Sequence, residues 1–421
     1  MAEEKPEVGD IVKLTTIKGE VEGRLLESPK TELYLIKLKS GYNIGIKKEN
    51  VHKIEVVEKF KTEREEYNYE KNPALPNVDI IITGGTISSS LDAKTGAVSN
   101  LTKPEQLLKY YPGLFKIANV RKIEVPFMVS SEDMNSEHWI KIAKVVEKSL
   151  NDSEVSGVIV THGTDFLHYT SAALSFFLKD LNKPVVLTYS QRSTDRASSD
   201  AALNLECAAR MAVSNVAEVM LVGHGSQNDD FCFAHKGTKV RKLHSSRRDA
   251  FKSVNASPIA KINSDGKIEY LDEFVRRNEG KVSLDVVFND KVALVKYYPG
   301  MDPEILDYYA SRYEGIVLEV GGLGHVAVSG KKSWIAKLKK VIDSGLKVAV
   351  CAQTIFGSLN PNVYSNGRTF EKTGAVFCKD MLAETALIKS GWILGHKKWK
   401  YEFKDKMLIN YAGEISDRIE K

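Results

Sequence analysis

The first part of the chain alternates short apolar stretches with turn residues. Over residues 8–57 the stretches DIVKLTT, VEGRLL, ELYLIKL and YNIGI are separated by Lys18-Gly19, Ser28-Pro29 and Ser40-Gly41. Strands of this length with close turns are typical of small all-β domains. We therefore expect residues 1–57 to form a small barrel of about five strands.

A charged stretch of low apolar periodicity follows, and the pattern changes at residue 77. Residues 58–76 mix both charges and end in two Xaa-Pro pairs, which predicts a linker. Beyond it, short apolar runs alternate with amphipathic stretches. The runs predict buried strands at 78–83, 122–129, 158–161, 185–189 and 216–222. The amphipathic stretches predict helices at 136–150, with Ser136 as N-cap, and at 166–181. Residues 77–281 therefore read as a large doubly wound α/β domain.

A second, smaller α/β pattern covers residues 282–421, tail included. Strands are predicted at 292–297, 315–320 and 347–351, and helices at 303–313, 332–344 and 380–389. Gly391 stands where a C-cap would close the last of these helices. The predicted fold class is α/β: a two-domain doubly wound core preceded by a small all-β barrel domain.

Composition adds few constraints on function. The 421 residues are 43% hydrophobic, which excludes disorder as the dominant state. Sixty Lys and Arg against 55 Asp and Glu leave a net charge of +5, too little to indicate a nucleic-acid coat or a membrane surface. The four cysteines are scattered, no apolar run reaches 18 residues, and the first residues are acidic. We therefore expect a cytoplasmic protein without a membrane span or a cysteine-based zinc site.

Candidate chemistry gathers where the predicted strands end. Thr83-Gly84-Gly85-Thr86 follows the first strand and Thr161–Asp165 follows the third, while polar groups also follow the second at 130–134 and the fourth at 188–192. Ligands of open α/β sheets bind beyond the carboxyl ends of the strands. A glycine turn and a helix N-cap are the structural alternatives for the first two motifs. The glycine spacing does not favour a nicotinamide cofactor.

These motifs resemble those of a known family. TGGTI at 83–87, SSEDMN at 130–135 and THGTD at 161–165 are similar, in order and distance, to three signatures of the bacterial-type L-asparaginase and glutaminase family. Lys242, before Asp249-Ala250-Phe251, is similar to the region of that family's catalytic lysine. The resemblance covers about residues 77–392. The all-β domain, the charged linker and the absence of an export signal resemble one branch, the D subunits of archaeal glutamyl-tRNA(Gln) amidotransferases.

The resemblance implies roles for the motif residues. Thr86 would be the nucleophile that forms an acyl-enzyme, while Thr164, Asp165 and Lys242 would form a relay for deacylation. Backbone N–H groups after Gly85 and Gly163 would form the oxyanion hole.

The same resemblance assigns the substrate's charged groups. Ser131 would bind the α-carboxylate of glutamine, and Glu132 and Asp165 would face its α-ammonium.

Two points are open on the residues alone. Many asparaginases carry a tyrosine after the TGGT turn, but residues 88–100 contain none, so Asp92, Lys94 and Thr95 are equal candidates for the proton relay of Thr86. Lys242 acts as a base only when it is neutral, which burial and the cationic neighbour Arg241 would favour. The alternative is that Lys242 belongs to a solvated basic run.

The resemblance also implies partners. A partner, the E subunit of the amidotransferase, would use ammonia from this chain to convert Glu-tRNA(Gln) to Gln-tRNA(Gln) with ATP, and a homodimer of this chain would form the core of a heterotetramer. No phosphate loop occurs here, so ATP and Mg²⁺ are expected on the partner, which would also make most of the tRNA contact. We expect no metal and no organic cofactor in this chain. The alternatives are a free-standing cytosolic L-asparaginase and a noncatalytic binding module on the same fold.

Overall fold

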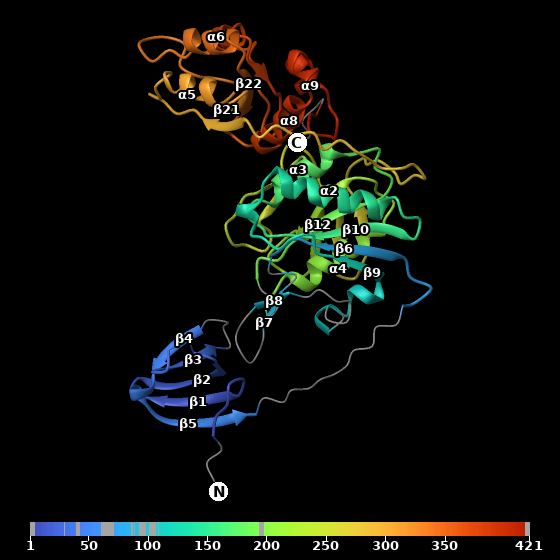
Figure 1. The fold of residues 1–421 in the computed structure, drawn as a ribbon, viewed down its shortest axis with the longest axis vertical. Coiled ribbons are helices and arrows are strands. Elements are labelled where there is room, and N and C mark those ends of the chain that lie inside the picture. Colours follow the sequence, from blue (N-terminus) through green and yellow to red (C-terminus); the bar gives the residue numbers. More distant parts are fainter. Residues whose placement is uncertain are drawn as a thin grey trace.

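The structure is a computed structural model that describes residues 5–28, 30–38, 43–59, 71–85, 87, 89–91, 98–100, 107, 109–192 and 198–416 (Figure 1). The N-terminal part is an antiparallel sheet of five strands in the order β4-β3-β2-β1-β5. Its strands are β1 (Ile11–Thr16), β2 (Gly19–Leu26), β3 (Leu33–Leu38), β4 (Asn43–Lys47) and β5 (Val51–Glu58). Alternate residues face a small core of Val12, Leu14, Leu25 and Ile36. The expected small all-β domain of five strands is confirmed. Among its described residues β4 and β5 are the edges of the sheet, and no pairing between them closes it into a barrel.

The large domain is built on an eight-stranded sheet in the order β18-β17-β14-β13-β12-β10-β6-β9. Its parallel part contains β6 (Asn77–Ile82), β9 (Asn119–Glu124), β10 (Val155–Thr161), β12 (Val185–Thr188) and β13 (Val219–His224). Its antiparallel part contains β14 (Phe231–Lys236), β17 (Ala260–Asn263) and β18 (Ile268–Tyr270). The five predicted strands are present. The second ends earlier than predicted, at Glu124, because Pro126 has no N–H to donate to a ladder.

Helices cover both faces of this sheet (Figure 1). The helices α2 (Ser136–Leu150) and α3 (Leu167–Phe177) share one core with Val158 and Val160, and α4 (Ala201–Ala212) shares the other with Ile159. Successive residues of β10 thus point to opposite cores, which explains its continuous apolar run.

The predicted boundaries of two helices need correction. The N-cap of α2 is Asn135, whose side chain accepts hydrogen bonds from the backbone N–H groups of Glu137 and His138. Ser136, the predicted cap, donates its hydroxyl to Asp290 instead. Helix α3 ends at Phe177 because the next residues form β11 (Leu178–Lys179), which pairs with β19 (Ser283–Leu284).

The C-terminal domain, residues 292–408, contains a parallel sheet in the order β20-β21-β22-β23. The strands are β20 (Val292–Lys296), β21 (Gly315–Val320), β22 (Lys347–Ala352) and β23 (Val376–Phe377). The helices are α5 (Ile305–Arg312), α6 (Ile335–Asp343), α7 (Ser365–Glu371), α8 (Ala383–Gly395) and α9 (Phe403–Leu408). Every strand and helix predicted for this domain is present, so the expected two-domain α/β core is confirmed.

Helix α8 joins the two α/β domains. It packs on both α3 and β21, and Trp392 stacks on Phe176 with ring centroids 5.5 Å apart. The predicted C-cap at Gly391 is wrong, because α8 continues to Gly395. A Cβ at Gly391 would lie 2.4 Å from Cζ of Phe288, so this glycine permits close packing inside the helix. None of the described helices is long and apolar enough to cross a membrane.

Candidate active site

The strand order places two of the motifs beside each other. From β6 the chain crosses to β9 on one side of the sheet, whereas β10, β12 and β13 follow one another on the other side. The order therefore reverses between β6 and β10, which is where open α/β sheets bind ligands. The residues that leave these strands are Thr83-Gly84-Gly85 and Thr161–Asp165.

The turn after β6 passes very close to the neighbouring loops. A Cβ at Gly84, where φ is +141°, would lie 2.4 Å from the carbonyl oxygen of Val129, and a Cβ at Gly85, where φ is +85°, would lie 2.5 Å from that of His162. Glycine is required here by both its backbone angle and the space. Thr86, the next residue, lies outside the described residues, as do the relay candidates Asp92, Lys94 and Thr95.

The turn after β10 is shaped by His162, which is fully buried. Its Nδ1–H donates to the carbonyl oxygen of Gly163 at 2.7 Å, so its Nε2 accepts from the hydroxyl of Thr170 at 2.8 Å. Burial lowers the pKa of His162 to about 4, so the ring is neutral at physiological pH. The histidine therefore fixes the Gly163 peptide that leads into Thr164.

Lys242 reaches this turn from another part of the chain. Its Nζ donates to Thr164 Oγ1 at 2.9 Å and to Asp165 Oδ1 at 2.6 Å, and Thr164 Oγ1 lies 3.5 Å from the same carboxylate oxygen. The lysine side chain is 8% exposed and that of Asp165 is 63% exposed. Three of the predicted catalytic residues thus meet, and the alternative of a solvated Lys242 does not fit this geometry.

A β-hairpin explains the spacing between Lys242 and the DAF sequence. Lys242 ends β15 (Val240–Lys242) and is the register partner of Phe251, which begins β16 (Phe251–Ser253). The preceding residue in β15 is Arg241, the expected cationic neighbour of Lys242. Its guanidinium forms an ion pair with Glu384 at 2.9 Å.

The predicted substrate-binding residues lie beside the same turn. Ser131 is buried at the start of a 3₁₀ turn (Ser131–Asp133), and its Oγ accepts from the backbone N–H of Phe166 at 3.4 Å. A Cβ at Gly163 would lie 3.2 Å from Cβ of Ser131, so the two loops are in direct contact. Glu132 is exposed, with one carboxylate oxygen 3.5 Å from the Ser131 hydroxyl.

The polar residues after β12 serve the structure. The carboxylate of Asp200 is fully buried and accepts hydrogen bonds from the backbone N–H groups of Gln191 and Arg192 and from the hydroxyl of Ser190. The side-chain hydroxyl of Thr188 donates to Val222 of the next strand. These hydrogen bonds thus hold the end of β12 and the loop that follows it in place.

His168 has no counterpart among the residues predicted from the sequence. It is buried on α3 with its ring against Tyr169 and Phe251, and no group in the described part of the chain forms a hydrogen bond with its Nδ1. Burial, together with the charges of Arg241 and Lys242, lowers its pKa to about 3. It stands in a helix whose residues are mostly buried, and its contact with Phe251 joins segments distant in sequence, so no local signal distinguishes it.

This arrangement supports proton transfer to and from a hydroxyl. An amine within hydrogen-bond reach of Thr164, itself held by a carboxylate, is the geometry that general acid–base catalysis requires. Within the described residues, no group of three or more His, Cys, Asp or Glu side chains could hold a metal ion.

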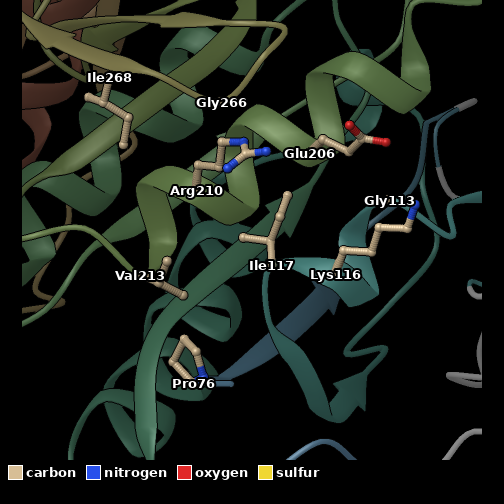
Figure 2. A pocket seen from close by; sticks show the side chains of 9 residues that line it. All are labelled: Pro76, Gly113, Lys116, Ile117, Glu206, Arg210, Val213, Gly266 and Ile268. Atoms are coloured by element: carbon tan, nitrogen blue, oxygen red, sulfur yellow. The ribbon is translucent and has the colours of Figure 1, made fainter. Parts of the chain in front are cut away.

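A separate groove of about 530 Å³ lies between α4 and the segments that lead into β6, β9 and β18 (Figure 2). Pro76 precedes β6, Ile117 precedes β9, and Glu206 and Arg210 come from α4. None of the predicted site residues that the structure describes lines it.

Comparison with known protein families covers all three parts of the chain. Residues 6–57 match the GatD N-terminal domain, residues 77–276 match the asparaginase N-terminal domain, and residues 291–407 match the glutaminase/asparaginase C-terminal domain.

Solved structures show the same fold for the α/β core. The thermostable L-asparaginase from Thermococcus kodakarensis superposes with a TM-score of 0.72 at 29% identity, over 81% of this chain and 100% of that one. L-asparaginase I from Vibrio cholerae has a TM-score of 0.69 at 24% identity, over 82% of this chain and 100% of that one, and shows the fold alone.

Curated relatives match over nearly the whole chain. The D subunit of the glutamyl-tRNA(Gln) amidotransferase of Pyrococcus furiosus is 48% identical over 97% of this chain and 95% of its own length. That of Methanococcus maripaludis is 41% identical, over 98% of this chain and 99% of its own length. With its N-terminal domain, its asparaginase-like fold and these relatives, the chain belongs to the family of glutamyl-tRNA(Gln) amidotransferase D subunits.

Proposed function

We propose that this chain is the glutaminase subunit of a Glu-tRNA(Gln) amidotransferase. It hydrolyses glutamine through a threonine acyl-enzyme and supplies the ammonia to a partner subunit. The observation that carries the proposal is the convergence of Lys242 on Thr164 and Asp165, at the reversal of strand order next to the Gly84-Gly85 turn. The names of the relatives support the wider assignment.

In the first half-reaction, the hydroxyl of Thr86 attacks the carboxamide carbon of glutamine. The C–O bond forms as the hydroxyl proton passes to a base, and the amide nitrogen leaves as ammonia after it gains a proton. Backbone N–H groups after Gly85 and Gly163 stabilise the oxyanion. Loss of one such donor typically costs ~10² to 10³ in rate.

In the second half-reaction, water attacks the acyl carbon, the bond from that carbon to the Thr86 oxygen breaks, and glutamate is released as Thr86 regains a proton. Thr164 accepts a proton from that water as it passes its own to the neutral amine of Lys242, and Asp165 holds the ammonium that results until its proton returns to Thr86. The 2.9 Å contact between Lys242 Nζ and Thr164 Oγ1 provides a direct path for this proton.

The substrate is oriented by groups around the same turn. The hydroxyl of Ser131 binds the α-carboxylate, while Glu132 and Asp165 face the α-ammonium. Both carboxylates are exposed in the free chain and are therefore accessible to a charged ligand. The ion pairs with the α-ammonium and the hydrogen bond to the α-carboxylate hold the amino acid at both charged ends.

The proposal extends to the assembly. Two copies of this chain form the core of a heterotetramer with two E subunits, which hold ATP and Mg²⁺ and most of the Glu-tRNA(Gln) contact. The complex works in the cytoplasm. The ammonia produced here is the nitrogen source for the conversion of Glu-tRNA(Gln) to Gln-tRNA(Gln).

The catalytic assignment is tested by removing the amine of Lys242. Lys242→Met is expected to lower kcat for glutamine by ~10² to 10⁴, the usual contribution of a general acid–base group. Lys267→Met, at an exposed lysine between β17 and β18, is the matched control and should keep wild-type activity. Equal activity of both variants would contradict the assignment, as would full glutaminase activity of both Thr86→Ala and Thr164→Ala.

The wider function is tested by the substrate and by the partner. Glutamine should be preferred to asparagine, and ammonia release should rise when the E subunit and Glu-tRNA(Gln) are added. Rapid hydrolysis of asparagine by the chain alone, with no response to the partner, would favour a free-standing asparaginase.

A further inference from the structure

The strand that carries Lys242 is attached to the C-terminal domain. The hydroxyl of Thr385 donates to the carbonyl oxygen of Thr238 at 2.9 Å, and Arg241 Nη2 lies 2.9 Å from Glu384 Oε1. Between these contacts, the buried ammonium of Lys239 is bonded to the buried carboxylate of Asp380. All three partner groups belong to the first turn of α8 or to the residues just before it, so one end of this helix holds the whole segment before Lys242.

The strand that carries Lys242, β15, does not belong to the large sheet. Within the described residues, it pairs with β16 alone, in a separate two-stranded sheet. Successive residues of a strand point to opposite faces. Arg241 therefore faces the C-terminal domain and Lys242 faces Thr164, as the contacts of each confirm.

The charge of the buried Glu384 carboxylate is compensated by its contact with Arg241. Its side chain is 7% exposed, Oε1 pairs with Arg241, and Oε2 is buried with no hydrogen-bond partner among the described residues. Burial raises the pKa of the nearby Glu319 on β21, and the negative charge of Glu384 adds to this effect. The guanidinium of Arg241 thus lies near two carboxylates, and its removal would leave a buried charge uncompensated.

We propose that Arg241 and Glu384 are positioning residues for Lys242, so that the C-terminal domain sets the geometry of the lysine relay. The inference rests on the proposed glutaminase function. Neither residue is among those proposed to contact the substrate or the reacting atoms; the ion pair acts through β15. A misplacement of about 1 Å in a catalytic group can cost ~10² in rate, so a loosened β15 should affect the chemical step.

The first test separates positioning from substrate binding. Arg241→Met and Glu384→Gln are expected to lower kcat for glutamine about 10- to 100-fold and to leave KM within about twofold, because the proposed ligands of the substrate lie on other loops. Arg241→Lys, which keeps a cation for Glu384, should recover most of the activity. Glu314→Gln is the matched control: it removes a carboxylate that pairs with Lys400 in the same domain at 2.8 Å, remote from β15.

The second test measures how firmly β15 is held and needs no activity assay. Hydrogen exchange of the peptide that contains residues 238–243 should speed up in Glu384→Gln and stay unchanged in Glu314→Gln. Thr385→Val removes only one hydroxyl contact to Thr238 and serves as a milder variant if the others fold poorly; its exchange at β15 should also rise.

The outcomes distinguish this inference from the function on which it rests. Wild-type kcat in Glu384→Gln and Arg241→Met, or a higher KM at unchanged kcat, would overturn the positioning role. So would unchanged exchange at β15 in folded Glu384→Gln and Thr385→Val. If Lys242→Met were itself fully active, the proposed function would fail and the positioning role with it.

Discussion

Burial keeps three histidine side chains of the large domain neutral at physiological pH. It lowers the pKa of His162 to about 4 and those of His168 and His235 to about 3. In the unfolded chain each would titrate near 6.5. Because the unfolded state binds these protons more tightly, the stability from this source is complete above about pH 6.5 and is lost as the pH falls toward the folded values.

His168 offers a direct test of this pH dependence. Between pH 6.5 and 5, each of these histidines should reduce the free energy of unfolding by about 2 kcal/mol. His168→Phe keeps an aromatic ring against Tyr169 and Phe251 and removes the titrating group. Urea unfolding at pH 6.5 and 5 should therefore show a smaller loss in the variant, by about 2 kcal/mol. An identical loss in both proteins would contradict a neutral, buried His168.

At single residues, the sequence was most informative where a motif defines a short turn. The THGTD residues were predictable because strand, glycine and polar group are adjacent, and Lys242 was found from its distance to Phe251, which the hairpin register explains. The partner of Arg241 could not be predicted, because Glu384 lies more than 140 residues away and only the packing of α8 brings the two together.

At the scale of elements, the glycine turn after β6 should be intolerant of any side chain. Gly85→Ala would place a methyl group 2.5 Å from the carbonyl oxygen of His162 at a φ of +85°. We expect at least a ~10²-fold loss of glutaminase activity, because the backbone amides proposed for the oxyanion hole would shift. Gly330→Ala is the matched control: φ there is +73°, but no atom of another described residue outside its chain neighbours lies within 4 Å of the added Cβ. Gly330→Ala therefore has the unfavourable backbone angle without the steric clash. A comparable loss of activity in both variants would contradict the steric explanation.

At Gly391, within α8, helix propensity and packing predict opposite effects of a substitution by alanine. Alanine stabilises an exposed helix interior by about 1 kcal/mol relative to glycine. Gly391→Ala should nevertheless lower the melting temperature, because its methyl group would lie 2.4 Å from the ring of Phe288. Phe288→Leu should recover part of that loss when combined with it. A higher melting temperature for Gly391→Ala alone would show that α8 can move away from Phe288.

Elements were predicted better than their ends. Buried parallel strands carry a strong apolar signal, and each predicted strand of both α/β domains is present. Ends depend on single hydrogen bonds that composition does not reveal. Asn135 rather than Ser136 caps α2, and α8 passes through Gly391 because a neighbouring ring needs the space.

At the scale of the whole molecule, the N-terminal sheet and the α/β core have separate hydrophobic cores. We therefore expect deletion of residues 1–71 to leave glutamine hydrolysis within about threefold of wild type, since every proposed catalytic residue is retained. The same deletion should weaken co-purification with the E subunit or binding of Glu-tRNA(Gln). Complex formation and tRNA binding equal to those of the full chain would remove this role from the N-terminal domain.

The two α/β domains contribute different parts of the proposed site. The large domain supplies the turns after β6 and β10, and the C-terminal domain holds the strand that brings Lys242 to them. Neither domain alone contains all the contacts that position Thr164, Asp165 and Lys242. Sequence patterns identify each domain separately, because periodicity is local, but the contacts between them arise only in the folded chain.

Trapping the acyl-enzyme tests the catalytic proposal most directly. The Thr164→Ala variant, which lacks the hydroxyl proposed for deacylation, should be mixed with glutamine, quenched in acid and analysed by mass spectrometry. The account predicts a glutamyl adduct on the peptide that contains Thr86, formed together with one equivalent of ammonia, and no adduct in Thr86→Ala. Multiple turnover by Thr164→Ala at the wild-type rate, or an adduct on any other residue, would contradict it.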